Sequence, residues 1–123
     1  MKHFSEMEVW KRSHKLVLRV YELTRSFPVD ERFGLVSQSR RAAVSVPANI
    51  AEGSKRSSAA DAARFMNTAE ASLAELDYEL LLARDLDYLT QDAWRPLHAE
   101  AFRIGRMLAR LRQALTARAR PNR

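Results

Sequence analysis

Apolar side chains recur every three or four residues along four stretches of the 123-residue chain, with polar segments between them. This spacing gathers them on one face of an α-helix, whereas a strand would alternate with a period of two. The pattern predicts helices at about residues 6–25, 31–53, 58–87 and 91–116, followed by a basic tail at residues 117–123. Four long amphipathic helices with short connections predict one all-α domain over residues 1–123, an antiparallel up-down-up-down four-helix bundle.

The expected helix ends rest on residues with known end preferences. Pro28 ends the first helix, because the residue before a proline is pushed out of the helical region. Asp30 is expected to cap the start of the second helix, and Gly53 to stop its end. Ser58 opens a capping box for the third helix, and Thr90 is the expected cap of the fourth.

One stretch, residues 38–56, departs from the regular pattern because Pro47 falls inside the second helix. A proline there removes one backbone hydrogen bond and clashes with the preceding turn, at about 3 kcal/mol. We therefore expect the second helix to be kinked. The polar residues around the proline either repair the kink locally or specify a contact with a neighbouring chain. The residues of this structural or interface motif are Gln38, Ser45, Pro47, Asn49, Glu52 and Gly53.

Within this motif, Asn49 and Glu52 need hydrogen-bond partners if they are buried. Their expected partners are Gln38, Arg41 or a neighbouring chain. Substitution of Asn49 is accordingly expected to disturb assembly or stability rather than any catalysis.

Charge is unevenly distributed along the chain, which has a formal net charge of +6 and a pI near 10.3. Such a charge favours polyanionic partners. Six acids and one base lie within residues 70–87, whereas residues 103–123 hold seven arginines and no acid. These segments either pair with each other, within the bundle or between subunits, or leave a basic surface free.

The arginines of the last helix are spaced so that they form a ladder beside its apolar seam. Such a ladder can neutralise phosphates and release counterions, or it can pair with the acidic third helix. Basic pairs also flank the proline motif. The candidates for nucleic-acid contact are Arg40, Arg41, Lys55, Arg56, Arg103, Arg106, Arg110 and Arg112. We expect contact with the backbone alone, because Phe102 is the one aromatic residue among the ladder arginines and no DNA-reading motif occurs.

Residues that would carry catalysis are missing from the sequence. None of His3, His14 and His98 follows a glutamate by three residues, as a di-iron bundle site requires. The three glycines are scattered, so no phosphate-binding loop is formed, and the serine-rich middle contains no histidine base. Cysteine is absent, which excludes disulfides and thiolate metal sites. We expect a protein that is not an enzyme and that uses no metal or other cofactor.

No stretch has the pattern of a signal peptide or a membrane span. The N-terminal residues lack an apolar run, and the longest aliphatic stretch, residues 80–83, is far below the ~20 residues that a span needs. We therefore expect a cytoplasmic protein with no membrane contact.

Several short motifs resemble those of a known family. They are Trp10, Tyr21-x-x-Thr24-x-x-Phe27-Pro28, Phe33-Gly34-Leu35, Gln38-x-x-Arg41-Ala42, Ser45-x-x-x-Asn49-Ile50-Ala51-Glu52-Gly53 and Ala69-x-x-Ser72-Leu73-x-Glu75-Leu76. Over residues 4–89 the chain is similar to the four-helix bundle proteins named for intervening sequences of bacterial 23S rRNA genes. The last helix resembles the family in pattern alone.

This resemblance implies an antiparallel four-helix bundle that assembles as a ring-shaped homopentamer, and it supplies no defined activity. More distant relatives of the same fold are accessory proteins of diversity-generating retroelements, which bind nucleic acid and a reverse transcriptase. An alanine-rich patch at residues 59–63 also favours close helix contacts between chains.

Two functions follow as hypotheses from the charge pattern and the resemblance. The first is a non-enzymatic homo-oligomer whose basic surface binds nucleic acid, with RNA ahead of DNA. The alternative is an interaction scaffold or accessory subunit that holds a partner protein, such as a reverse transcriptase, without touching nucleic acid.

Overall fold

The computed structural model describes residues 1–120, and within that range it contains four long helices, two short 3-10 turns and no strand. The predicted all-α fold with four helices is confirmed. The elements, in order, are η1 (Phe4–Glu6), α1 (Glu8–Thr24), η2 (Val29–Glu31), α2 (Leu35–Ser54), α3 (Ala59–Asp85) and α4 (Gln91–Ala119). Of the predicted basic tail, residues 117–119 continue α4, and residues 121–123 lie outside the described part of the chain.

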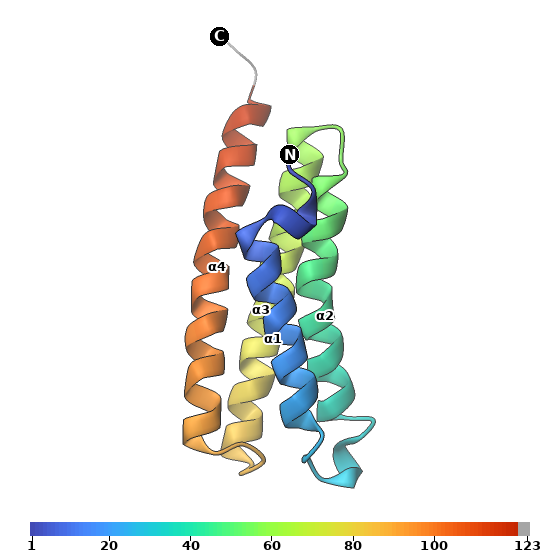
Figure 1. Ribbon diagram of the computed structural model, residues 1–123, viewed down its shortest axis with the longest axis vertical. Coiled ribbons are helices and arrows are strands. Elements are labelled where there is room, and N and C mark those ends of the chain that lie inside the picture. The colour runs from blue at the N-terminus through green and yellow to red at the C-terminus, as the bar shows by residue number, and fades with distance from the viewer. Residues whose placement is uncertain (121–123) are drawn as a thin grey trace.

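The four helices lie side by side, and each packs against two others (Figure 1). Contacts join α1 to α2, α2 to α3, α3 to α4, and α4 back to α1. The connections after α1 and α3 lie at one end of the molecule, and the connection after α2 lies at the other. The apolar faces meet along the central axis, where the largest fully buried side chains include Ile50, Met66, Leu76, Ile104 and Leu108.

Two of the predicted caps are present. The hydroxyl of Ser58 accepts a hydrogen bond from the Asp61 amide at 3.1 Å, and that of Thr90 accepts one from the Ala93 amide at 3.0 Å. Each bond satisfies one of the backbone donors that a helix start leaves unpaired. The starts of α3 and α4 therefore follow from local sequence.

The start of α2 differs from the prediction, which placed it at residue 31 with Asp30 as cap. Residues Val29–Glu31 form the turn η2, and the helix begins four residues later with Gly34 at the cap position. The carboxylate of Glu31 accepts a hydrogen bond from the Leu35 amide at 3.1 Å, so it replaces a capping side chain at Gly34. Its other oxygen accepts a hydrogen bond from the Tyr88 hydroxyl at 2.9 Å.

The predicted role of Gly53 as the end of the second helix is wrong, because α2 continues through it to Ser54. Gly53 is buried where α2 crosses α3. A Cβ atom at this position would lie 2.6 Å from Met66 Cε and 3.0 Å from Phe65 Cβ. The glycine therefore permits a close approach between two helices.

Pro47 lies inside α2, which remains helical on both sides of it. Near the proline, the Asn49 side-chain amide donates hydrogen bonds to the Ser45 carbonyl at 2.8 Å and to the Ser45 hydroxyl at 3.0 Å. The Ser45 hydroxyl also bonds to that of Ser72 on α3 at 2.8 Å. The kink itself stays a prediction.

A search of the described helices for a segment long and apolar enough to cross a membrane found none.

Candidate nucleic-acid interface

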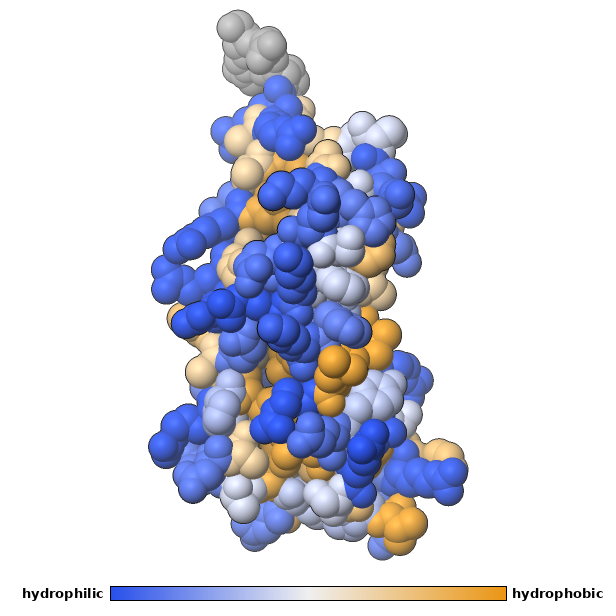
Figure 2. All heavy atoms as spheres, in the orientation of Figure 1, coloured by the Kyte–Doolittle hydropathy of each residue, from blue (hydrophilic) through white to orange (hydrophobic). Residues whose placement is uncertain are grey.

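Three arginines of α4 form an exposed ladder on the outside of the bundle. Arg103, Arg106 and Arg110 make no ion pair with an acidic residue anywhere in residues 1–120. Phe102 lies beside Arg106, with its side chain 64% exposed and its ring centre 6.0 Å from the Arg106 guanidinium. Hydrophilic side chains project from the middle of α4 in Figure 2. The ladder is therefore free to meet anions from solution.

The fourth predicted ladder residue, Arg112, is used inside the bundle. Its Nε donates a hydrogen bond to Glu70 Oε2 of α3 at 2.7 Å. A second link between the two helices joins His98 Nδ1 to Asp77 Oδ1 at 2.9 Å. Each of the two alternatives for the ladder therefore applies to part of it. Arg112 pairs with the acidic helix α3, whereas the three arginines before it leave a basic surface free.

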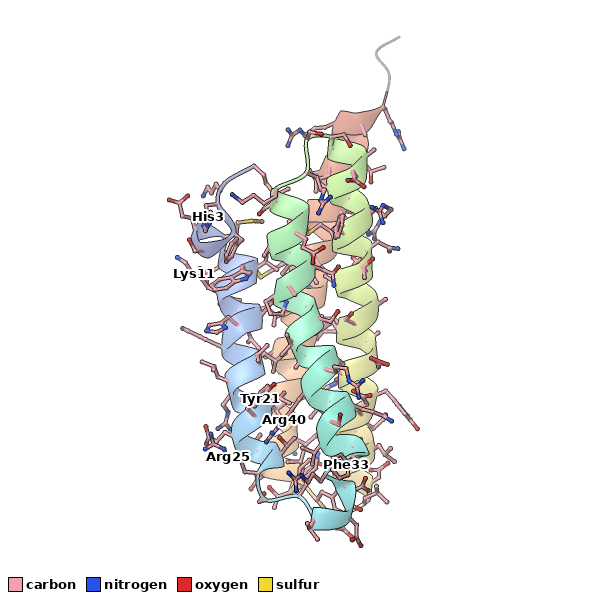
Figure 3. The ribbon with its side chains drawn as sticks, turned by 90° about the vertical axis from the view of Figure 1, so that its right-hand side faces the viewer. His3, Lys11, Tyr21, Arg25, Phe33 and Arg40 are labelled. Carbon is pink, nitrogen blue, oxygen red and sulfur yellow. The ribbon has the colours of Figure 1, made fainter. Side chains whose placement is uncertain are left out.

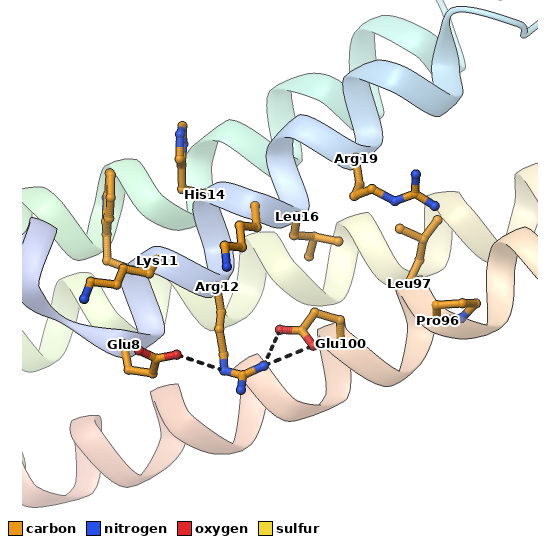
Figure 4. Close-up of a pocket in the computed structure, with 11 residues that line it drawn as sticks. Glu8, Lys11, Arg12, His14, Leu16, Arg19, Pro96, Leu97 and Glu100 are labelled. Carbon is orange, nitrogen blue, oxygen red and sulfur yellow. Dashed lines mark hydrogen bonds and ion pairs between the residues drawn. The ribbon is translucent and has the colours of Figure 1, made fainter.

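On α1, which packs against α4, four further cationic side chains lie within residues 11–19. Arg12 pairs with Glu100 of α4 at 3.1 Å, and Arg19 pairs with Glu22 at 3.2 Å. Lys11 and Lys15 have no acidic partner among the described residues and are exposed. Figure 4 shows Lys11, Arg12 and Arg19 around a cavity of about 550 Å³ along α1 and the start of α4, which Lys15 also lines. The α1 cations were not among the predicted contacts, although their clustering within residues 11–19 is a signal present in the sequence.

The basic pairs that flank the proline motif mostly serve packing. Arg40 donates to Thr24 Oγ1 at 2.9 Å, and its guanidinium lies 4.5 Å from the centre of the Tyr21 ring (Figure 3). This joins α2 to the end of α1. Arg41 donates to Ser37 of its own helix at 2.9 Å.

At the far end of α2, Arg56 is also engaged. Its guanidinium covers the Phe65 ring at 4.5 Å and approaches Asp61 at 4.0 Å, which holds the connection against α3. Lys55 beside it is exposed and has no acidic partner within residues 1–120. Of the predicted contacts in these two pairs, Lys55 and Arg41 remain the most accessible.

Unpaired positive charge thus gathers on α1 and α4, while α3 carries more acidic residues than any other helix. From Ala59 to Asp85, α3 holds six acids, against the two bases Arg64 and Arg84. A phosphate chain would therefore be attracted to one side of the bundle and repelled from another.

The chain matches the model of a known protein family. The family model described as 23S rRNA-intervening sequence protein matches residues 5–110, which is most of the chain. The chain belongs to the 23S rRNA-intervening sequence protein family. The match extends well into α4, beyond the residues on which the sequence resemblance rested.

A solved structure is similar to this family member in fold. It is a protein of unknown function from the S23 ribosomal protein family of Bacteroides thetaiotaomicron VPI-5482, with 23% sequence identity and a TM-score of 0.77. The similarity covers 85% of this chain and 98% of the other. No curated protein matches.

The proline motif of this 23S rRNA-intervening sequence protein is held by local bonds. Asn49 bonds to Ser45 rather than to Gln38 or Arg41, because the nearest acceptors lie one helical turn away on its own helix. Gln38 and Glu52 are exposed. Their side chains are therefore available to a neighbouring molecule, whereas the Asn49 side chain is bonded within its own helix.

One acidic residue of the same family member is unusual because it is buried. Glu79 of α3 is 5% exposed, and its Oε1 atom has no hydrogen-bond partner among the described residues. Burial, and to a lesser degree the nearby carboxylate of Glu75, raise the pKa of Glu79 to about 7. Within residues 1–120 no three histidine, aspartate or glutamate side chains converge as metal ligands would.

Proposed function

We propose that this protein is a non-enzymatic, oligomeric up-down-up-down bundle that binds the backbone of nucleic acid, RNA ahead of DNA. The observation that carries the proposal is the set of unpaired cations on one side of the bundle. The set, called here the α1/α4 basic face, consists of Lys11, Lys15, Arg103, Arg106 and Arg110. An arginine that already holds a carboxylate gains little from a phosphate, whereas these five hold no carboxylate within residues 1–120.

Binding through this face would be electrostatic and nearly independent of sequence. Each neutralised phosphate contributes about 0.7–0.9 to the slope of log affinity against log salt. Five contacts per chain would therefore lower affinity on the order of 100- to 500-fold between 50 and 200 mM salt.

Assembly would strengthen this binding. A ring of five chains, as the family resemblance implies, repeats the α1/α4 basic face and lets one polyanion contact several copies. Light scattering should give a mass well above that of the 14.1 kDa chain. A monomer at micromolar concentration would exclude this part of the proposal.

The direct test is fluorescence anisotropy with a structured RNA and with duplex DNA, each at 50 and 200 mM salt. We expect binding at low salt that weakens steeply with added salt, with RNA bound at least as tightly as DNA. Absence of binding to either at 50 mM salt would refute the proposal.

A second candidate function, a scaffold for a partner protein, is favoured by one surface. A cavity of about 320 Å³ between α3 and α4 is lined by the small residues Ala74, Gly105 and Ala109 and by the exposed Phe102. Exposed aromatic side chains beside apolar hollows are frequent in protein interfaces. Capture of one partner protein, such as a reverse transcriptase, that resists nuclease treatment would favour this function over nucleic-acid binding.

A further inference from the structure

Four aromatic rings form a continuous row from η1 onto α1. His3 lies 4.3 Å from Phe4, Phe4 lies 5.0 Å from Trp10, and Trp10 lies 5.1 Å from His14, measured between ring centres. The Trp10 and His14 rings are almost parallel, at 8°. The inner members of the row are half-buried, and His14 at its end is exposed. His14 thus presents a ring that is already held in place by stacking.

Lysines accompany this stacked pair in a repeating pattern. Lys11 follows Trp10 and Lys15 follows His14, so an aromatic ring and a lysine recur one helical turn apart. All four side chains are among those that line the cavity of about 550 Å³, and in Figure 4 the His14 side chain points away from α4, on the other side of α1 from Arg12 and Glu100. Neither lysine has an acidic partner in the described part of the chain. Stacking surface and free positive charge therefore lie side by side.

We infer that this part of α1 binds a single-stranded segment of nucleic acid, with an unpaired base stacked on His14 and the adjoining phosphates on Lys11 and Lys15. The inference rests on the proposed function and sharpens it, because backbone contact alone does not distinguish single strands from duplexes. Bases within a duplex are covered by their neighbours, so the His14 ring can accept an unpaired base only. The prediction of backbone contact alone rested on the α4 arginines, where Phe102 is the one aromatic residue, and did not include the aromatic residues of α1.

The chain contains a second stacked pair that lacks these features. Trp94 and His98 on α4 have the same spacing and lie 4.8 Å apart at 14°. However, His98 is bonded to Asp77 at 2.9 Å, and the Arg84 guanidinium covers Trp94 at 4.3 Å. A carboxylate beside His98 repels phosphate, and this pair serves to join α4 to α3. It provides a matched control for the first pair.

The test compares His14→Ala with His98→Ala in the full-length chain, using a fluorescein-labelled ten-nucleotide oligouridine and a ten-base-pair RNA duplex at 50 mM salt. We expect His14→Ala to lower affinity for the single strand about 5- to 20-fold and to change duplex affinity less than twofold. His98→Ala should change neither by more than twofold. Circular dichroism checks that both variants retain their helices.

The outcomes separate this inference from the proposed function. An equal effect of His14→Ala on single strand and duplex, or no effect on either, overturns the single-strand site while the backbone proposal stands. If neither ligand binds the unmodified protein at 50 mM salt, both fail together. Titration with oligothymidine of the same length shows whether the site requires RNA. Affinity equal to that for oligouridine indicates a general single-strand site, and weaker affinity indicates a site that requires RNA.

A spectroscopic measurement gives an independent readout. The variant Trp94→Phe leaves Trp10 as the sole tryptophan, so its emission reports on the stacked pair. We expect the single strand to quench this emission and the duplex to leave it within a few per cent of its starting value. Equal quenching by both ligands would contradict the inference.

Discussion

Arg112 and Glu70 join the basic helix to the acidic one, with 2.7 Å between Nε and Oε2. Both side chains are largely shielded, being 34% and 20% exposed. Arg103, Arg106 and Arg110 on the same helix have no such partner within residues 1–120. Four arginines that look equivalent in the sequence therefore divide into one that holds the bundle together and three that face solvent.

Replacement of Arg112 should accordingly affect stability rather than binding. We expect Arg112→Gln to lower the free energy of unfolding by about 1 kcal/mol, because a charge-assisted hydrogen bond between helices is lost. Nucleic-acid affinity should fall less than for Arg106→Gln. Urea unfolding and RNA titrations of the two variants provide the comparison, and the reverse order would show that the assignment of Arg112 is wrong.

The two helical glycines Gly53 and Gly105 should respond oppositely to the same substitution. Gly53→Ala should lower the free energy of unfolding by about 1–3 kcal/mol, because the new methyl group meets Met66 and Phe65. A Cβ at Gly105 would approach Leu73 at 3.5 Å, an ordinary contact. Gly105→Ala should therefore raise the free energy of unfolding by about 0.5–1 kcal/mol, because alanine has a higher helix propensity than glycine. Chemical denaturation measures both, and stabilisation by Gly53→Ala would contradict the close approach of α2 and α3.

Asn49 should contribute to the stability of α2 around Pro47. Asn49→Ala removes two hydrogen bonds to Ser45, and we expect a loss of about 1 kcal/mol or a smaller assembly. Gln38→Ala, at an exposed position on the same helix, should stay within about 0.5 kcal/mol. If calorimetry and light scattering of Asn49→Ala match the unmodified protein, the motif has no structural role.

Glu79 should make stability depend on pH. The folded chain raises the pKa of Glu79 from 4.5 to about 7, so it binds this proton more tightly than the unfolded chain does. The contribution of protonated Glu79 to the free energy of unfolding is fully present below about pH 4.5. It is lost as the pH rises to about 7, which lowers the free energy of unfolding by on the order of 2–3 kcal/mol.

The variant Glu79→Gln should remove this dependence. We expect it to be more stable than the unmodified protein at pH 8 and similar to it at pH 4.5, as measured by urea unfolding. Glu75→Gln, which removes the smaller cause of the shift, should flatten the dependence only slightly. Parallel stability curves for Glu79→Gln and the unmodified protein would show that the carboxyl group titrates normally.

Much of the fold could be predicted because the deciding signals are local. Periodic apolar positions give the four helices, and Ser58 and Thr90 cap their helices as their sequence context indicates. Gly53 and the start of α2 were mispredicted because tertiary contacts decide them. At Gly53, the side chains of α3 lie too close for a Cβ atom, and the carboxylate of Glu31 accepts a hydrogen bond from the first amide of α2. Neither contact is visible in a helical pattern.

The candidate site shows the same division. Arg103, Arg106 and Arg110 could be selected from spacing and charge. The separate role of Arg112 depends on which acid of α3 lies opposite it, which sequence spacing does not give. Lys11 and Lys15 of α1, which complete the basic face, were not among the predicted contacts.

The central claim is that the α1/α4 basic face, rather than net charge, binds nucleic acid. The triple variant R103Q/R106Q/R110Q and the control R25Q/R32Q/R41Q remove the same charge from exposed arginines that have no acidic partner within residues 1–120, on and off this face. Titration of a structured RNA at several salt concentrations should show that the first variant loses at least 50-fold in affinity at 50 mM salt and about 3 units of salt slope. The control should stay within about threefold of the unmodified protein. Equal losses in the two variants would contradict the claim.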